Sequence, residues 1–130
     1  MARENLAGNN GSRGNYGFRG NNGFRGNNGF RGNINYYADK DTAWVKKLKH
    51  EKKNYGFMVL DPPREGLSAP FTKWLAAHGP ELVAYVSCDP ANLARDSRIL
   101  VAGGYTLKEL TLYDFYPQTA HIESLALFSR

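Results

Sequence analysis

The sequence predicts an α/β fold built on a mainly parallel, Rossmann-like sheet, and three observations favour it. Apolar strand-like segments alternate with helical segments from residue 34 onward. The segment at 55–60 is apolar without alternation, as a strand covered on both faces should be, and the segment at 82–87 is predicted to be a buried apolar strand. The last two predicted strands, 105–113 and 122–128, have no helix between them, which indicates an antiparallel pair at one edge of the sheet.

The helices are predicted from their end signals and apolar periodicity. After a short strand over 34–38, Asp41 opens a helix that extends to about residue 53 and keeps its lysines outside. Ser68 is placed to begin a second helix, which runs to about residue 77. A third helix runs from Pro90 to about residue 102, where the glycine pair at 103–104 ends it.

Charge and glycine are concentrated near the amino terminus. The chain has 130 residues and a formal net charge of +5, and residues 1–33, with five arginines and one glutamate, carry +4 of it. Nine of the 14 glycines lie between Gly8 and Gly32, so the globular part is expected over 34–130. The positive charge permits an RNA or phosphate partner without establishing one.

Glycine recurs at every third position from Gly8 through Gly32. The segment contains no proline, so a collagen triple helix is not expected. We expect residues 8–33 to be a disordered or loosely extended Gly/Asn/Arg-rich insertion, preceded over 1–7 by the end of a helix. Its arginine and aromatic spacing resembles that of RNA-binding tails that stack on bases. An inert loop insertion is the alternative.

The number of cysteines and the length of the apolar runs bear on cellular compartment and membrane association. A single cysteine excludes an intrachain disulfide and fits a reducing compartment. No apolar run approaches the roughly 18–20 residues of a membrane span, and no signal-peptide core is present at the start. We therefore expect a cytoplasmic protein without a membrane partner.

Cys88 is the only cysteine, and it lies between the strand at 82–87 and a helix that Asp89 is placed to cap. Open α/β sheets bind ligands at the carboxyl ends of their strands. The N–H groups at a helix N-terminus favour the thiolate, which is the nucleophilic form. Cys88 is therefore either a nucleophile or a small buried apolar residue.

Two further segments carry polar groups toward the same edge. The sequence Asp61-Pro62-Pro63-Arg64 follows a predicted strand, and Asp61 either accepts hydrogen bonds from a ligand or starts a turn. The connection over 114–123 is rich in aromatic and polar residues. Glu123 ends it and is a candidate general base, with His121 as its competitor.

Three segments together resemble the carboxyl-terminal catalytic half of the S-adenosylmethionine-dependent RNA (uracil-5-)-methyltransferases, which act on transfer and ribosomal RNA. They are LDPPREG at 60–66, VSCDPANLARD at 86–96 and DFYPQTAHIES at 114–124. The resemblance covers about residues 34–130, together with the helix end at 2–7. It implies the later strands of a class I methyltransferase sheet, S-adenosyl-L-methionine as cofactor and RNA as partner.

The resemblance also implies roles for individual residues. Cys88 matches the nucleophile that adds to C6 of the target uracil, and Glu123 matches the base that removes the C5 proton. Asp61 matches an acidic residue of the donor-binding set, and Asp39 matches a position that approaches the donor's adenine. Arg64 and Arg95 are either phosphate-binding or structural. A uracil in a duplex would have to leave its stack to reach the thiol.

Other parts of the family pattern are not found in this sequence. The glycine-rich donor-binding turn and the acidic residue that binds the donor ribose are missing, and the glycine triplets lack the strand and helix context that would replace the turn. An amino-terminal RNA-binding barrel and the cysteine cluster of some members are also missing, so no metal site is expected. We expect a truncated enzyme, a split enzyme whose donor-binding half is supplied by a separate chain, or an incomplete gene model.

Two alternatives to the enzyme hypothesis remain. The chain could be a non-enzymatic RNA-binding protein whose affinity lies in the Gly/Arg/Phe-rich segment. It could also be a degenerate product without a stable fold, because a partial sheet exposes an edge strand.

Overall fold

The computed structural model describes residues 19–25, 31–37, 40–50 and 55–130, with side chains described from residue 40 onward. It divides into two units, Met1–Lys40 and Asp41–Arg130, and each is described by itself. Among the described residues, no helix is long and apolar enough to cross a membrane.

The first unit contains a two-stranded antiparallel sheet. Strand β1 (Arg19–Arg25) pairs with β2 (Arg31–Tyr37). The strand predicted over 34–38 is confirmed for its described residues, but its partner is a segment of the glycine repeat and not the larger sheet. Pairing with a strand this close in sequence costs less loop-closure entropy than pairing with a strand that lies beyond a helix. The helix end over 1–7 lies outside the described residues, and disorder stays a prediction for the parts of 8–33 that the structure does not describe, 8–18 and 26–30.

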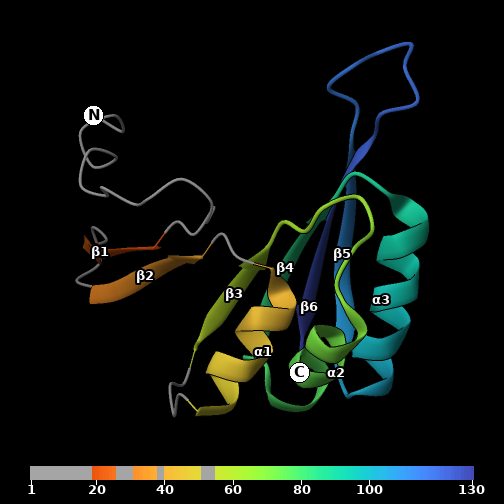
Figure 1. The fold of residues 1–130 in the computed structure, drawn as a ribbon. Helices are drawn as coiled ribbons and strands as arrows, with labels where there is room; N and C mark the ends of the chain where they lie inside the picture. The colour runs from red at the N-terminus through yellow and green to blue at the C-terminus, as the bar shows by residue number, and fades with distance from the viewer. Residues whose placement is uncertain (1–18, 26–30, 38–39, 51–54) are drawn as a thin grey trace. The chain divides into compact units, whose positions relative to one another are not determined.

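The second unit contains every helix and strand predicted for residues 41–130, with small shifts at their ends (Figure 1). In chain order these are α1 (Asp41–His50), β3 (Phe57–Leu60), α2 (Ala69–His78), β4 (Leu82–Ser87), α3 (Pro90–Ala102), β5 (Thr106–Tyr113) and β6 (Glu123–Ser129). The predicted caps explain this agreement. The Ser68 side chain accepts from the N–H of Phe71 at the start of α2, and Asp89 accepts from Asn92 at the start of α3.

The four strands of this unit form one mixed sheet in the order β3-β4-β6-β5. Strands β3 and β4 are parallel, whereas β6 is antiparallel to both β4 and β5. The predicted antiparallel pair at one edge is therefore confirmed, with β5 as the edge strand. The α/β class is confirmed as well, although the sheet is mixed and not mainly parallel.

The hydrophobic core lies between one face of the sheet and the helices. Alternate residues of β6 are buried, as expected for a strand with one covered face. Tyr85 and Phe128 point into this core from β4 and β6, and Leu75 of α2 and Leu100 of α3 meet them with no solvent exposure. This packing fixes β4 against α3, which follows it in the sequence.

The prediction that β3 is covered on both faces is wrong for the described residues. Phe57 and Val59 are 56% and 59% exposed, and Leu82, the partner of Phe57 on β4, is 51% exposed. The other two residues of the strand, Met58 and Leu60, contribute to the core or pack against it. An unalternating apolar strand therefore does not by itself establish that both of its faces are covered.

Candidate active site at one edge of the sheet

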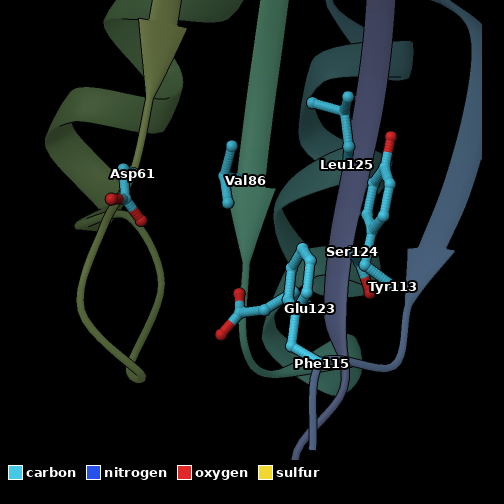
Figure 2. Close-up of a pocket in the computed structure, with 7 residues that line it drawn as sticks. All are labelled: Asp61, Val86, Tyr113, Phe115, Glu123, Ser124 and Leu125. Carbon is cyan, nitrogen blue, oxygen red and sulfur yellow. The ribbon is translucent and has the colours of Figure 1, made fainter.

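Three predicted site residues lie at one edge of the larger sheet: Asp61 follows β3, Cys88 follows β4 and Glu123 begins β6. Strands β3 and β4 end there, and because β6 runs antiparallel to both neighbours, β6 begins there and β5 ends there. A cavity of about 410 Å³ opens at this edge, within the range of roughly 300–1,000 Å³ typical of ligand pockets. It is lined by Asp61, Val86, Tyr113, Phe115, Glu123, Ser124 and Leu125 (Figure 2).

Two predicted site residues, Asp61 and Glu123, line this cavity together. Asp61 is exposed and comes directly after β3, whereas Glu123 is half-buried as the first residue of β6. Figure 2 shows the Glu123 carboxylate directed toward the side on which Asp61 lies, with Val86 of β4 above it in this view. Two carboxylates beside apolar side chains can accept hydrogen bonds, attract a cation or take a proton.

Cys88 is not one of the residues that line the cavity, but the strand register brings it beside one of them. Its thiol is free and half-buried. The β4–β6 ladder ends where Ser87 pairs with Ser124. Cys88 directly follows Ser87 in the sequence, and Glu123 directly precedes Ser124. Glu123 is the first residue of β6, and Cys88 lies in the bend that follows β4. The candidate nucleophile and the candidate base are therefore each one residue away from the same register pair.

The turn that carries Cys88 is held by hydrogen bonds on both sides. The Ser87 hydroxyl donates to the Asp89 carbonyl (2.9 Å) and accepts from the Asp89 N–H (3.1 Å). The Asp89 carboxylate accepts from the N–H of Asn92 (2.8 Å), which confirms the predicted cap. Cys88 therefore has a defined position at the start of α3.

Asp39, the fourth predicted site residue, lies outside the described residues, so its place near a donor adenine stays a prediction. Among the described residues, no group of three His, Cys, Asp or Glu side chains could hold a metal ion.

The guanidinium group of Arg95 holds the loop between β3 and α2. Its Nη2 donates to the carbonyl oxygens of Glu65 (2.9 Å) and Leu67 (3.1 Å), and its Nη1 donates to Oδ1 of Asn92 (2.9 Å). Its Nε donates to Oδ1 of Asp96 (2.9 Å). The sequence leaves open whether Arg95 binds phosphate or is structural. The structure favours the structural role, because each of the three guanidinium nitrogens already donates to a partner in the chain.

Asp96 joins three elements through one buried carboxylate. The side chain is 1% exposed, and its Oδ2 accepts from the N–H of Leu67 (2.8 Å) and from the hydroxyl of Tyr85 (2.8 Å). It thereby connects the loop after β3, strand β4 and helix α3. The spacing of Asn92, Arg95 and Asp96, which places them on one helix face, is the sequence signal from which this role could have been predicted.

Arg64 and His121 connect the loops that follow β3 and β5. Nη2 of Arg64 lies 3.3 Å from Nδ1 of His121. Because a guanidinium group only donates, the imidazole accepts at Nδ1 and carries its proton on Nε2 in this contact. His121 does not line the cavity, whereas Glu123 does, which favours Glu123 over His121 as the proton acceptor.

Five of the lining residues were not predicted as site residues. They are Val86, Tyr113, Phe115, Ser124 and Leu125. Their common feature is position, since all lie near the same edge on β4, β5, β6 or the β5–β6 loop. The position of β6 between β4 and β5 brings them together. The sequence predicts that β6 pairs with β5, but no local pattern specifies that it also pairs with β4.

Comparison with known protein families identifies residues 36–130 as matching the family model described as tRNA (Uracil-5-)-methyltransferase. The chain belongs to the tRNA (uracil-5-)-methyltransferase family. This agrees with the resemblance that the three sequence segments carry, and it covers the whole of the larger sheet.

Similar proteins include an uncharacterized RNA methyltransferase of Treponema denticola, 40% identical over 75% of this chain and 24% of its own length. Another is the 23S rRNA (uracil(1939)-C(5))-methyltransferase RlmD of Shewanella denitrificans, 51% identical over 72% of this chain and 19% of its own length. This member of the family thus spans about a fifth to a quarter of the length of these relatives.

A solved structure of the same family is also similar. It is the Pyrococcus abyssi tRNA (uracil-54, C5)-methyltransferase in complex with S-adenosyl-L-homocysteine. The match has a TM-score of 0.55 and 26% sequence identity, and it covers 69% of this chain and 27% of that chain. The likeness supports the arrangement of sheet and helices described above.

We expect the stability of this tRNA (uracil-5-)-methyltransferase family member to fall at alkaline pH. Burial, followed by the hydrogen bond to Asp96, raises the pKa of Tyr85 well above its ordinary value of 10.0, and burial also raises the pKa of Tyr105. The folded protein therefore keeps these protons at a pH where the unfolded chain has lost them. Stability from both groups is complete below about pH 10 and falls as the pH rises above it.

Urea unfolding between about pH 8 and pH 11 measures this effect. The free energy of unfolding should decline above about pH 10, and Tyr85→Phe should make the decline shallower because one of the two groups no longer ionises in the unfolded chain. Parallel declines for the parent chain and the variant would contradict the assignment.

Proposed function

We propose that this chain contributes Cys88, Glu123 and Asp61 to an S-adenosylmethionine-dependent site that methylates C5 of uridine in RNA. The observation that supports the proposal is the strand register: the β4–β6 ladder ends at the Ser87–Ser124 pair, which Cys88 directly follows and Glu123 directly precedes in the sequence. Glu123 and Asp61 also line the same cavity. Family membership supports it, as do the names of the relatives that methylate uracil C5 in ribosomal and transfer RNA.

The chemistry assigns one step to each of two side chains. C5 of uracil is a poor nucleophile, and addition of the Cys88 thiolate to C6 makes C5 electron-rich enough to accept a methyl group. S-adenosylmethionine, when bound, supplies that methyl group from its sulfonium centre. Glu123 then removes the proton from C5, the C5–C6 double bond re-forms, and the Cys88 thiolate is expelled. The half-buried position of Glu123 suits a group that takes a proton without direct competition from bulk water.

The residues present fit part of a methyl-donor site. Asp61 supplies a carboxylate that can accept hydrogen bonds from donor amines or hydroxyls or attract a sulfonium charge. Val86 and Leu125 supply apolar surface beside it. Asp39 remains the proposed contact for the adenine.

The proposed substrate is transfer or ribosomal RNA, with the target uridine unpaired or swung out of its stack before Cys88 can reach it. In the relatives, the matching segment is part of one longer chain, so the comparisons do not support a separate chain as the source of the remaining donor site. The lone cysteine supports a reducing compartment, and we propose a cytoplasmic location.

RNA that contains 5-fluorouridine tests the assignment directly. In 5-fluorouridine, C5 carries fluorine in place of the hydrogen that Glu123 would remove as a proton. The bond between Cys88 and C6 should therefore persist after methyl transfer. We expect an RNA–protein adduct that survives denaturing electrophoresis, formed by this chain or by the chain reconstituted into a full-length family member. Cys88→Ala should abolish the adduct. Absence of an adduct from both forms, or an adduct that survives Cys88→Ala, would reject the mechanism.

The charge distribution favours a second candidate function, RNA binding by the Gly/Arg/Phe-rich segment without catalysis. Residues 1–33 carry most of the net positive charge. Deletion of residues 8–32 should then abolish salt-sensitive RNA binding in a filter assay. Unchanged binding would reject this candidate.

A further inference from the structure

Three large aromatic side chains within a four-residue segment are exposed to solvent. The segment comprises the end of β5 and the start of the following loop. Tyr113 is 39% exposed, Phe115 is 63% exposed and Tyr116 is 62% exposed. Figure 1 shows the β5–β6 connection as a loop that projects beyond the sheet. Grouped exposed aromatic surface of this kind marks an interaction site more often than a structural one.

Two of these rings form a flat, stacked pair. The ring centroids of Tyr113 and Phe115 are 5.5 Å apart, and the ring planes differ by 3°. This is an offset parallel arrangement. Tyr113 covers one face of the Phe115 ring, and the large exposed fraction of Phe115 leaves the other face open to a further planar group.

The loop that presents the pair is held by hydrogen bonds. Both the N–H and the hydroxyl of Thr119 donate to the Tyr116 carbonyl (3.1 and 2.7 Å), and the Thr119 hydroxyl accepts from the N–H of His121 (3.3 Å). Gln118 has φ +69°, a left-handed conformation that is costly for a residue other than glycine. The Arg64–His121 contact adds a connection to the loop after β3. The rings are therefore presented by a defined turn.

The pair also belongs to the cavity. Tyr113 and Phe115 line it together with Glu123, and Tyr113 is the register partner of Glu123 on the neighbouring strand. Figure 2 shows the Phe115 ring beside the Glu123 side chain. A planar group stacked on Phe115 would thus lie next to the candidate base.

We propose that the Tyr113–Phe115 pair is a stacking platform for an unpaired base of the RNA substrate. This inference rests on the proposed function for the nature of the substrate. The flat aromatic face suits any base, because every base has a π-face, and the platform therefore adds affinity with little sequence preference. The net positive charge of the chain adds attraction to the RNA backbone.

Affinity for a short single-stranded RNA, measured with the full chain carrying Cys88→Ala so that no covalent bond forms, tests the platform. Phe115→Ala should weaken binding about 5- to 100-fold, the range expected for the loss of one base–aromatic stack. Phe115→Leu should weaken it similarly, because leucine keeps apolar surface but has no ring, and Phe115→Trp should preserve it. The matched control is Phe57→Ala, since Phe57 is 56% exposed on β3 and does not line the cavity. Binding by Phe115→Leu equal to that of the parent would overturn stacking.

A fluorescence measurement on Phe115→Trp reports the contact locally. RNA should quench the emission of the introduced indole, while Phe57→Trp should respond no more than the parent chain. Quenching together with the absence of an adduct on 5-fluorouridine RNA, both from this chain and from the reconstituted full-length form, would support the platform and reject the methyl-transfer proposal. An adduct at Cys88 with no effect of Phe115→Ala would support the methyl transfer and overturn the platform. Equal responses of the Phe115→Trp and Phe57→Trp variants, or none in either, would also overturn the platform.

Discussion

Replacing Asp96 by alanine is expected to lower the free energy of unfolding by about 2–4 kcal/mol. The side chain is almost fully buried and accepts hydrogen bonds from the Leu67 N–H, the Tyr85 hydroxyl and Arg95. Without the carboxylate, the first two donors stay buried and unpaired, and each such group costs roughly 1–3 kcal/mol. The Arg95 side chain is 46% exposed, so it regains water and contributes little to the loss.

Urea unfolding of the Asp96→Ala variant measures this loss. Asp96→Asn keeps one acceptor oxygen in nearly the same shape, so its stability should lie between those of the parent and the alanine variant. The matched control is Asp114→Ala, at an exposed aspartate, which should change stability by no more than about 0.5 kcal/mol. Equal losses for Asp96→Ala and Asp114→Ala would refute the role of the buried network.

Replacing Gly66 by alanine is expected to lower the free energy of unfolding by about 2–5 kcal/mol, from backbone strain and overpacking together. Gly66 has φ +77°, which L side chains rarely adopt. An added Cβ would lie 2.7 Å from Oδ2 of Asp96 and 2.8 Å from Nη2 of Arg95. The variant therefore forces apart the hydrogen bonds that hold the loop after β3.

Two other glycines separate the causes of this effect. Gly104 has φ +100° but no atom within 4 Å of an added Cβ, so Gly104→Ala should show the backbone strain alone, about 1–2 kcal/mol. Gly56 has neither a positive φ nor a near neighbour, and Gly56→Ala should be close to neutral. The order of loss in urea unfolding should be Gly66, then Gly104, then Gly56. A loss at Gly104 as large as that at Gly66 would show that contact with Asp96 and Arg95 adds nothing.

Both expected results concern the same connection between the two halves of the candidate site. Asp61 lies on the loop after β3, and Cys88 lies directly before α3. Asn92, Arg95 and Asp96 of α3 bond to backbone groups of that loop. The network therefore fixes the candidate donor-binding residue relative to the candidate nucleophile, and a variant that loosens it should also reduce adduct formation on 5-fluorouridine RNA.

The helix starts illustrate what a sequence can predict. Asp89 and Pro90, and likewise Ser68, place a side-chain acceptor within a few residues of the N–H group it must satisfy. These interactions are local, so they can be predicted from the sequence before any tertiary contact is known. The same local reasoning places Asp61, Cys88 and Glu123 at one edge of the sheet, because Asp61 and Cys88 directly follow predicted strands and Glu123 lies at the start of the last one.

Other features depend on residues far apart in the chain. The sequence by itself determined the α/β class, the helix and strand segments of 41–130 and three residues at one edge of the sheet. Only the tertiary structure decided that β2 pairs with β1, that one face of β3 is open among the described residues, that Arg95 is structural and that Tyr113 and Phe115 border Glu123. The reason is physical. Short-range caps and periodicity act within one element, whereas burial, register and hydrogen-bond partners arise when elements that are distant in sequence pack together.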